Sequence, residues 1–432
     1  MIDIALIRSS PEIIINDLKK RNDPEKLKWV ESVKKIDDEW RVLKQNEDEL
    51  RHKLNVISDE IKKSKDKKII QHKISEAKSL SAEIQGLSVK QESLKQEIDF
   101  FLLRFPNILD ETVPLGKSPD NNVVIKEHGG KTKFDFKPKD HIELLDLLDI
   151  ADIERAGKVA GARFYYLKNE GVLLDHALQS FALDFMLKKG FALFRTPELL
   201  RQGALLSAIP FSDFEEVIYK VENEDLYLIG TAEHPLTAFH SDELLLKKFL
   251  PLKYAGVSNC YRKEAGSHGK DTKGIYRVHE FRKVEQYVLC LPEDSKKIHS
   301  ELLKNAEEIF QLLEIPYRIV DICSADIGTV AAKKFDIEAW LPARGNYGEV
   351  VSCSNCTDYQ ARRGNIRFLD PDGKPKFVHT LNSTVLATTR AIVALLENHQ
   401  QKDGSVLIPK ALQPFMHGIK KIVPKPKVKL TV

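Results

Sequence analysis

Two long stretches in the first quarter of the chain carry apolar residues at alternating steps of four and three. The first runs from Trp29 to Ile61 and the second from Ile70 to Phe101. This spacing is typical of paired helices that bury one narrow apolar seam. The intervening segment, KKSKDKK at 62–68, is short and polar. The pattern therefore predicts an antiparallel helical hairpin of coiled-coil type.

Three polar residues, Glu47, Lys73 and Gln91, stand within the apolar register of this hairpin. One interpretation of such a hairpin is a coil that joins copies of the chain. The turn favours a different one, because its five lysines and single aspartate suit phosphate groups better than they suit a buried protein partner.

The remainder of the chain mixes shorter helical and strand-like patterns. Residues 176–190, HALQSFALDFMLKKG, form an amphipathic pattern that ends at a glycine. Further helices are predicted at 293–313 and 385–400, and strands at 225–230, 251–264, 275–290, 317–322 and 349–354. Closely spaced strands of this kind favour a largely antiparallel sheet flanked by helices, and hence an α+β fold.

Composition shifts divide the chain into four expected parts. These are a helical N-terminal domain at 1–110, a linker at 111–140, a mixed core at 141–420 and a Lys/Pro tail at 421–432. The linker is expected because this stretch is rich in Pro, Asn, Gly and Asp. Its Gly116-Lys117-Ser118 resembles the end of a phosphate-binding loop, but Glu111 stands where that motif needs a glycine.

Charge and cysteine content narrow the class of protein. A net charge of +3 over 432 residues does not indicate a globally basic nucleic-acid-binding protein, so such a partner needs local basic patches. Five scattered cysteines argue against a disulfide framework. No apolar run approaches the roughly 20 residues that span a bilayer, and charged residues interrupt the first twenty positions. We expect a cytoplasmic protein with no membrane association.

Residues 260–286, CYRKEAGSHGKDTKGIYRVHEFRKVEQ, predict two strands joined by a long loop rich in glycine and lysine. Because alternate residues of a strand share a face, Cys260, Arg262 and Glu264 should lie together, as should Arg277, His279, Phe281, Lys283 and Glu285. If the two faces coincide, they offer arginines for phosphate or carboxylate, a ring for stacking and two acids. This set suits a nucleotide and an amino acid. The alternative is a solvated hairpin face with cross-strand ion pairs.

Two later segments add chemistry of the same kind. YGEVVSCSNCTDYQARR (347–363) places Glu349 in a strand, where a carboxylate near phosphates can hold Mg²⁺. Its Cys353 and Cys356 lack a second pair of zinc ligands at matching spacing, so we expect structural cysteines and no zinc. HTLNSTVLATTRAIVALLENHQ (379–400) puts Arg390 in the first turns of an apolar helix, where it needs an anionic partner.

These segments resemble motifs 2 and 3 and the serine-binding loop of the seryl-tRNA synthetases, a family of class II aminoacyl-tRNA synthetases. The resemblance covers almost the whole chain, including the hairpin. The runs GSHGKDTKGIYRVHEF, VSCSNCTDYQARR and LNSTVLATTRAI are more similar to the eukaryotic cytosolic branch than to the bacterial one. The resemblance implies a class II catalytic core and a serine–tRNA ligase that uses ATP and Mg²⁺. The alternative is an inactive relative that binds tRNA or another partner, but such proteins should lose a motif arginine or a pocket acid, and all are present.

The resemblance also implies roles for individual residues. The groups implied in catalysis are Arg262, Glu285 and Arg390. The implied ATP site comprises Arg262, Glu264, Arg277, Val278, Phe281, Glu349, Ser352 and Arg390. The implied serine site comprises Thr231, Glu233, Arg262, Glu285, Asn382 and Thr384. Glu349 and Ser352 would hold Mg²⁺, yet strict strand alternation puts these two on opposite faces, so a bulge or a strand end is required between them.

The implied partners are L-serine, tRNA-Ser and a second copy of the chain. The hairpin would bind the long variable arm of the tRNA, and the loop with Lys270 and Lys273 would follow its acceptor end. Residues 176–200, with Pro197, are similar to motif 1, which builds the dimer interface in this family.

Overall fold

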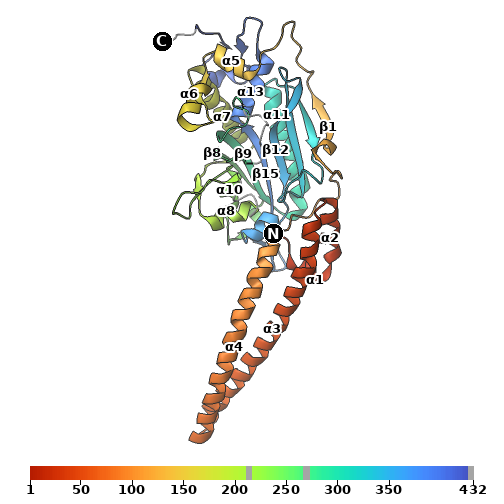
Figure 1. Ribbon diagram of the computed structural model, residues 1–432, viewed down its shortest axis with the longest axis vertical. Helices are drawn as coiled ribbons and strands as arrows, with labels where there is room; N and C mark the ends of the chain where they lie inside the picture. Colours follow the sequence, from red (N-terminus) through yellow and green to blue (C-terminus); the bar gives the residue numbers. More distant parts are fainter. Residues whose placement is uncertain (211–216, 266–272, 427–432) are drawn as a thin grey trace. The chain divides into compact units, whose positions relative to one another are not determined.

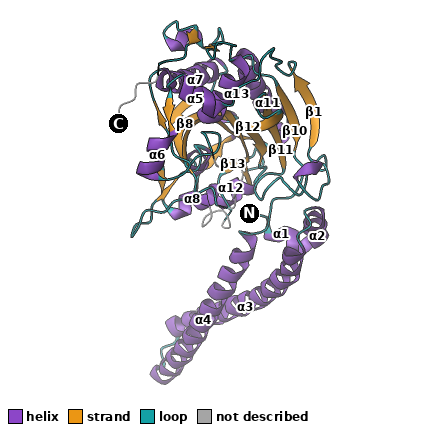
Figure 2. Ribbon diagram, turned by 45° about the horizontal axis from the view of Figure 1, so that its top comes forward, coloured by secondary structure: helices purple, strands orange, loops and turns teal. Residues whose placement is uncertain are grey.

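The structure is a computed structural model that describes residues 1–210, 217–265 and 273–426. It contains two compact units, Met1–Phe105 and Pro106–Val432. The elements described in the first unit are helices, and the second unit is built around a sheet (Figures 1 and 2). None of the described helices is both long and apolar enough to cross a membrane.

The first unit contains the predicted helical hairpin. Its helices are α1 (Ile4–Ser9), α2 (Pro11–Lys20), α3 (Pro24–Lys63) and α4 (Lys67–Leu102). The long helices α3 and α4 pack against each other along the apolar seam. Both begin at an aspartate whose side chain accepts a backbone hydrogen bond, Asp23 from Lys26 and Asp66 from Lys68. The prediction of an antiparallel hairpin is confirmed.

The polar residues in the seam bond across the hairpin. Gln91 Nε2 donates to Glu47 Oε2 at 2.6 Å, and Ser88 Oγ donates to Glu47 Oε1 at 3.2 Å. Lys73 forms an ion pair with Glu60 of the other helix. Because a buried polar group without its partner is costly, these contacts favour one register of α3 against α4.

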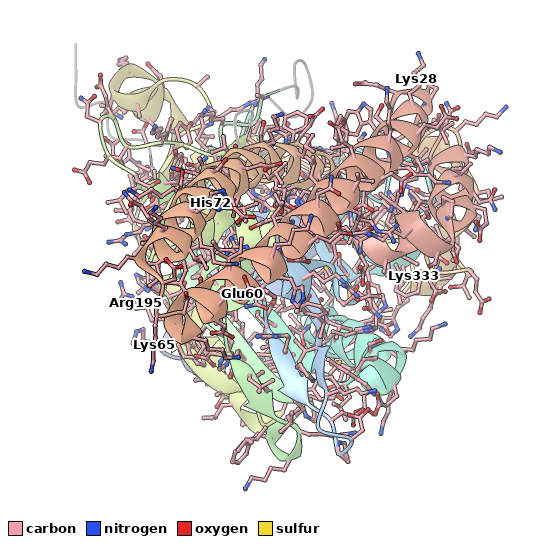
Figure 3. All side chains as sticks on the ribbon, turned by 90° about the horizontal axis from the view of Figure 1, so that it is seen from below. Lys28, Glu60, Lys65, His72, Arg195 and Lys333 are labelled. Carbon is pink, nitrogen blue, oxygen red and sulfur yellow. The ribbon has the colours of Figure 1, made fainter. Side chains whose placement is uncertain are left out.

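The turn of the hairpin presents the basic surface expected from the sequence. Lys62, Lys63, Lys65, Lys67 and Lys68 are all exposed. Figure 3 shows Lys65 at the turn, at the opposite end of α3 from Lys28. Exposed ammonium groups at this density attract polyanions such as nucleic-acid backbones.

The second unit is organised by an eight-stranded sheet within the described residues, in the order β1-β10-β11-β12-β15-β9-β8-β4. Its strands are β1 (Val123–His128), β4 (Ala192–Arg195), β8 (Leu252–Tyr261), β9 (Glu280–Cys290), β10 (Tyr317–Asp321), β11 (Lys333–Leu341), β12 (Asn346–Asn355) and β15 (His379–Ala387). Every neighbouring pair is antiparallel except β4 with β8. The prediction of a largely antiparallel sheet in an α+β fold is confirmed.

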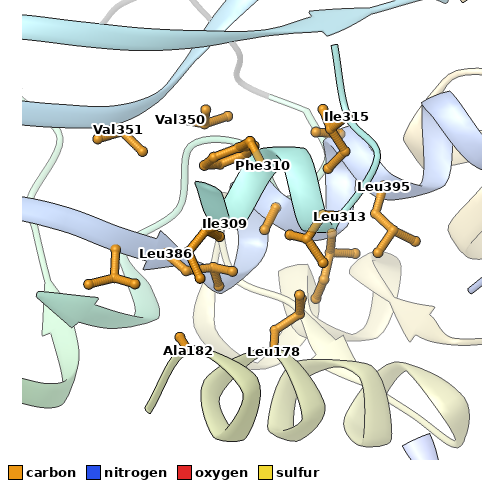
Figure 4. Close-up of a cluster of buried hydrophobic side chains, with 14 of the residues drawn as sticks. Leu178, Ala182, Ile309, Phe310, Leu313, Ile315, Val350, Val351, Leu386 and Leu395 are labelled. Atoms are coloured by element: carbon orange, nitrogen blue, oxygen red, sulfur yellow. The ribbon is translucent and has the colours of Figure 1, made fainter. Parts of the chain in front are cut away.

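One face of the sheet is covered by α7 (Glu170–Lys188), α11 (Ser295–Leu312) and α13 (Thr388–His399). Figure 4 shows side chains of these helices meeting those of the sheet, among them Leu178, Phe310, Val351 and Leu386. The alternation of β9 explains the division, because Val284 and Val288 enter this core while Lys283 and Glu285 line the cavity on the other face. The helical face is the core, which leaves the opposite face for chemistry.

The structure differs from the sequence-based expectation in several places, of which three concern the main sheet and the end of the chain. The stretch expected to be a linker contains β1, an edge strand that pairs with β10. Strand β11 was not predicted, although Phe335, Ile337, Ala339 and Leu341 alternate with polar or larger residues along it. The expected tail includes β17 (Lys421–Ile422), which pairs with β16 (Val406–Leu407). Residues 427–432 lie outside the described part of the chain.

Candidate active site

A cavity opens on the face of the sheet opposite the one that α7, α11 and α13 cover. Phe281, Lys283 and Glu285 of β9 line it, together with Asn382 and Thr384 of β15. Thr384 and Glu285 are direct partners in the sheet, and Thr384 Oγ1 donates to Glu285 Oε2 at 3.4 Å. Three smaller helices, α8 (Gln202–Ala208), α10 (Glu233–Ala238) and α12 (Tyr359–Arg363), belong to this side of the unit.

All the residues that the family resemblance assigns to ATP, serine or Mg²⁺ line this single cavity. They are Thr231, Glu233, Arg262, Glu264, Arg277, Val278, Phe281, Glu285, Glu349, Ser352, Asn382, Thr384 and Arg390. The cavity is also lined by Tyr276, Lys283, Lys334, Val350, Ala387 and Thr389. Residues from separate parts of the chain therefore meet at one place.

The arginines reach the cavity by a different route from the one that strand alternation predicts. Strand β8 ends at Tyr261 and β9 begins at Glu280, so Arg262, Glu264 and Arg277 lie beyond the strand ends. The backbone of Glu264 is left-handed, with φ 51°. Arg277 Nη1 donates to Glu264 Oε2 at 2.7 Å, and this contact joins the two arms of the hairpin. Strand alternation does not place these three residues, because they lie outside the strands.

Two other residues expected on the same face do not line the cavity among the described side chains. Cys260 is fully buried, and His279 Nδ1 lies 2.9 Å from the carbonyl oxygen of Arg262, to which it can donate. Residues 266–272, which include Lys270, lie outside the described residues. Lys273 is exposed.

Arg262 connects two regions of the cavity. Its Nε donates to the carbonyl oxygen of Gly230, next to Thr231, at 3.3 Å. Its guanidinium carbon lies 5.3 Å from the centroid of the Phe281 ring. One guanidinium group thus stands between the ring and the acidic end of the cavity, and its remaining N–H groups can bind an anion there.

A β-bulge brings Glu349 and Ser352 to the same side of β12. Along β11, Ile337 pairs with Val351, whereas the next residue pairs with Glu349, so Val350 is the extra residue. The bulge removes the conflict with strand alternation, and both side chains line the cavity.

The Glu349 carboxylate is surrounded by positive charge. Arg390 Nη1 lies 3.1 Å from Glu349 Oε1 and also donates to the Glu349 carbonyl oxygen at 3.1 Å. Burial raises the pKa of Glu349, but the charges of Arg390, Lys334 and Arg262 outweigh burial and lower the pKa below its usual value. Glu349 is therefore ionised at neutral pH and able to hold a cation.

The oxygen atoms near Glu349 fit Mg²⁺, which prefers carboxylate and hydroxyl oxygens. Asp336 is paired with Ser352 in the sheet and is buried. Its Oδ1 has no hydrogen-bond partner among the described atoms. Among the described residues, no three His, Cys, Asp or Glu side chains cluster as a metal site. Burial raises the pKa of the Cys353 and Cys356 thiols, which disfavours thiolate ligands.

The acidic end of the cavity contains Glu233 and Glu285. Burial, reinforced by the charge of Glu285, raises the pKa of Glu233 to about 7. Lys283 Nζ lies 2.5 Å from Glu285 Oε2, and both side chains are almost completely buried. Lys283 thus compensates one of the two acids, and Glu233 is the acid for which a bound cation is most favourable.

Family models match both units. A model of the seryl-tRNA synthetase N-terminal domain matches residues 1–109, and a model of the class II tRNA synthetase core domain (G, H, P, S and T) matches residues 218–399. A serine–tRNA ligase from Pyrococcus horikoshii is 51% identical over 99% of this chain and 98% of its own length. The chain belongs to the seryl-tRNA synthetases. A relative from Methanocella arvoryzae is 49% identical over 97% of the chain and 99% of its own length.

Solved structures of seryl-tRNA synthetases agree with this placement. The crystal structure of the Pyrococcus horikoshii enzyme complexed with ATP has a TM-score of 0.93 and covers 99% of this chain and 100% of its own. The cytoplasmic serine–tRNA ligase from Naegleria fowleri in complex with AMP has a TM-score of 0.87 at 36% identity, with 99% of each chain covered.

Sequence reasoning gave no role to Tyr276, which joins several parts of this seryl-tRNA synthetase site. Its hydroxyl donates to the carbonyl oxygen of Glu349 at 2.8 Å. The guanidinium carbons of Arg390 and Arg344 lie 5.2 and 4.9 Å from its ring centroid. A tyrosine next to a motif arginine has no pattern of its own in the sequence, and only the fold reveals these contacts.

Gly274 precedes this tyrosine and provides a sharp test of how the segment is held. Its φ is +79°, and a Cβ there would lie 2.1 Å from Nε2 of His141. His141 is buried, with Nδ1 3.2 Å from Glu397 Oε1. We expect Gly274→Ala to cost about 1–3 kcal/mol beyond the backbone strain and to reduce activity strongly, because Tyr276 and Arg277 must shift.

The matched control is Gly328→Ala. Gly328 has nearly the same φ, +77°, but no atom lies within 4 Å of its added Cβ. Denaturant unfolding and pyrophosphate exchange should therefore separate the two variants. Equal losses in both would show that the contact with His141 has no importance.

Proposed function

We propose that the chain is an active serine–tRNA ligase. It converts L-serine and ATP to seryl-adenylate and pyrophosphate, and then transfers the seryl group to the 3′ end of tRNA-Ser with release of AMP. The observation that carries this proposal is the single cavity, in which arginines and an aromatic ring adjoin a buried acidic end. No observation favours the inactive alternative, since every motif arginine and pocket acid is present.

The nucleotide belongs at the end of the cavity that contains Phe281. Its ring offers a stacking surface for one face of the adenine, and Arg390 would cover the other face of the adenine. Arg277 and Glu264, which now pair with each other, would turn to the γ-phosphate and the adenine amino group. The hydrogen bond between Arg277 and Glu264 would then be replaced by hydrogen bonds from each side chain to the ATP. This exchange is needed because a charged group removed from water is costly without a partner.

Serine belongs at the acidic end. Its ammonium group would meet Glu233 and Thr231, and its hydroxyl would meet Glu285 and Thr384. If alanine bound as substrate in place of serine, the buried polar groups of Glu285 and Thr384 would lack a hydrogen-bond partner. This cost is the main reason why alanine should be rejected. Threonine has the hydroxyl and must be rejected by its extra methyl group, which is a weaker basis.

Activation of serine requires alignment more than proton transfer. The attacking carboxylate is already ionised at neutral pH, so no general base is needed. Arg262 adjoins both Gly230 and the Phe281 ring, and can bind the serine carboxylate together with the α-phosphate. Held in line, the two reactants gain the advantage of an intramolecular reaction, and the arginines stabilise the negative charge on the phosphate oxygens in the transition state.

Mg²⁺ would be held by Glu349 and Ser352, and would supply charge neutralisation on the phosphate oxygens. Asp336 lies opposite Ser352 in the sheet, but its Oδ2 is 3.2 Å from Lys334 Nζ and burial raises its pKa, so Glu349 and Ser352 remain the expected ligands. Arg390 fixes Glu349 through both its carboxylate and its carbonyl oxygen.

The partners follow from surfaces outside the cavity. The lysine-rich turn of the hairpin suits the backbone of a tRNA, and we assign it to the long variable arm. A homodimer through residues 176–200 is supported by exposed Leu187, Leu193 and Leu199 and by β4 standing at the sheet edge. Sedimentation of the purified protein tests the dimer. We propose that the protein is located in the cytoplasm, where its product would be used in translation.

The proposed function is tested by serine-dependent ATP–pyrophosphate exchange, followed by charging of total tRNA. We expect exchange with serine, none above background with alanine, and labelled seryl-tRNA as product. Exchange without charging would remove the ligase assignment, and absence of both would favour the inactive relative.

A further inference from the structure

The side chain of Gln360, in α12, is fully buried next to the acidic end of the cavity. Its Nε2 donates to Glu233 Oε1 at 2.7 Å and to the carbonyl oxygen of Ala208, the last residue of α8, at 3.1 Å. Its Oε1 accepts from Thr380 Oγ1 at 2.6 Å. Both the NH₂ group and the oxygen of the amide thus have hydrogen-bond partners.

These partners leave only one orientation of the amide. The carbonyl oxygen of Ala208 can only accept, so the group that faces it must be the NH₂ group. The same NH₂ group faces Glu233, and the hydroxyl of Thr380 donates to the opposite end. A buried amide with fixed donors holds the carboxylate of Glu233 in one position.

We propose that Gln360 is a positioning residue for the serine pocket, which aims the Glu233 carboxylate at the substrate ammonium group. This inference rests on the proposed function and names the residue that sets one part of its specificity. Gln360 itself does not line the cavity among the described residues, so it acts through Glu233.

The charges around Glu233 explain why such a donor is needed. Burial and the nearby Glu285 raise the pKa of Glu233, whereas Lys283, the bond from Gln360 and Arg262 lower it. The other titratable groups near it are Tyr287 of β9 and the thiol of Cys356, whose pKa values the charge of Glu233 helps to raise, and His234, the next residue of its own helix. Burial disfavours the charged form of each. Of the neutral groups, the Gln360 amide is the one bonded to the carboxylate in the described structure.

The sign of the pH dependence follows from these contacts. A hydrogen bond to the ionised carboxylate lowers the pKa of Glu233, so its removal raises that pKa further. The protonated acid binds an ammonium group poorly. Loss of the Gln360 donor should therefore weaken serine binding most at pH 6–7, and the defect should shrink as the pH rises.

The test compares Gln360→Met with Gln286→Met in pyrophosphate exchange between pH 6 and 8.5. Gln286 is an equally buried glutamine on the helical face of β9, where it donates to the carbonyl oxygen of Leu302 at 2.9 Å. For Gln360→Met we expect the KM for serine at pH 7 to rise about 10- to 100-fold, with the KM for ATP nearly unchanged. The midpoint of its KM–pH profile should also move to higher pH. Gln286→Met should lose similar thermal stability without either change.

The outcomes separate this inference from the proposed function. An unchanged serine KM in Gln360→Met, or the same KM rise and pH shift in Gln286→Met, would overturn the positioning role while wild-type exchange remains normal. A wild-type protein without serine-dependent exchange would overturn the proposed function and the inference with it.

Discussion

Arg262→Ala should abolish adenylate formation, with a loss of about 10³-fold or more in serine-dependent exchange. The reason is position, since Arg262 touches both the Gly230 carbonyl and the Phe281 ring and thus stands where the two substrates meet. Removing its guanidinium group takes away charge stabilisation and alignment at once. Arg262→Lys keeps the charge but not the two-pronged geometry, and should recover only a small part of the rate.

The control for this variant is Arg318→Ala. Arg318 also lies over an aromatic ring, that of Tyr347 at 4.6 Å, and its Nε lies 2.6 Å from Glu338 Oε2, but it does not line the cavity. Its loss should leave exchange within about twofold of wild type. Near-normal exchange in Arg262→Ala, with the fold confirmed by circular dichroism, would remove Arg262 from the mechanism.

Shortening the hairpin should have the second large effect, and on the other half-reaction. Residues 50–86 can be replaced by a short Gly/Ser linker, because Glu47 and Ser88 already lie in contact across the hairpin. The Glu47–Gln91 bond then still closes the shortened end. We expect serine-dependent exchange to stay near wild type and charging of tRNA to fall by about 10²-fold or more, since the lysine-rich turn is lost.

The matched variant keeps the full hairpin and replaces Lys62, Lys63, Lys65, Lys67 and Lys68 with glutamine. If charge at the turn carries the effect, this variant should reproduce much of the charging defect and reduce its salt dependence. Equal loss of exchange and charging in the shortened protein would contradict the division of labour between the two units.

Parts of the fold could be predicted because they follow a short repeat. The heptads gave both long helices and their turn, and alternation placed Phe281, Lys283 and Glu285 on one face. Strand β1 was hidden by its surroundings, since turn-forming residues on both sides of Val123–His128 made the stretch look like a linker. Its pairing with β10 depends on residues almost two hundred positions away.

Which residues form the site could be predicted from the sequence, but how they reach the cavity could not. Family resemblance named residues that all line one cavity, yet Arg262 and Arg277 reach it from beyond the strand ends. A bulge or strand end between Glu349 and Ser352 was needed for both to reach one face, but no residue pattern showed that the bulge lies at Val350. Gln360 and Tyr276 act through single hydrogen bonds to other residues of the site, and such contacts leave no periodic trace.

The most direct measurement is a crystal structure with a non-hydrolysable seryl-adenylate analogue. We expect adenine against Phe281, the linking group at Arg262, and the seryl ammonium group beside Glu233, with the seryl hydroxyl toward Glu285 and Thr384. An analogue bound in another cavity, or with adenine at the acidic end, would contradict this expectation.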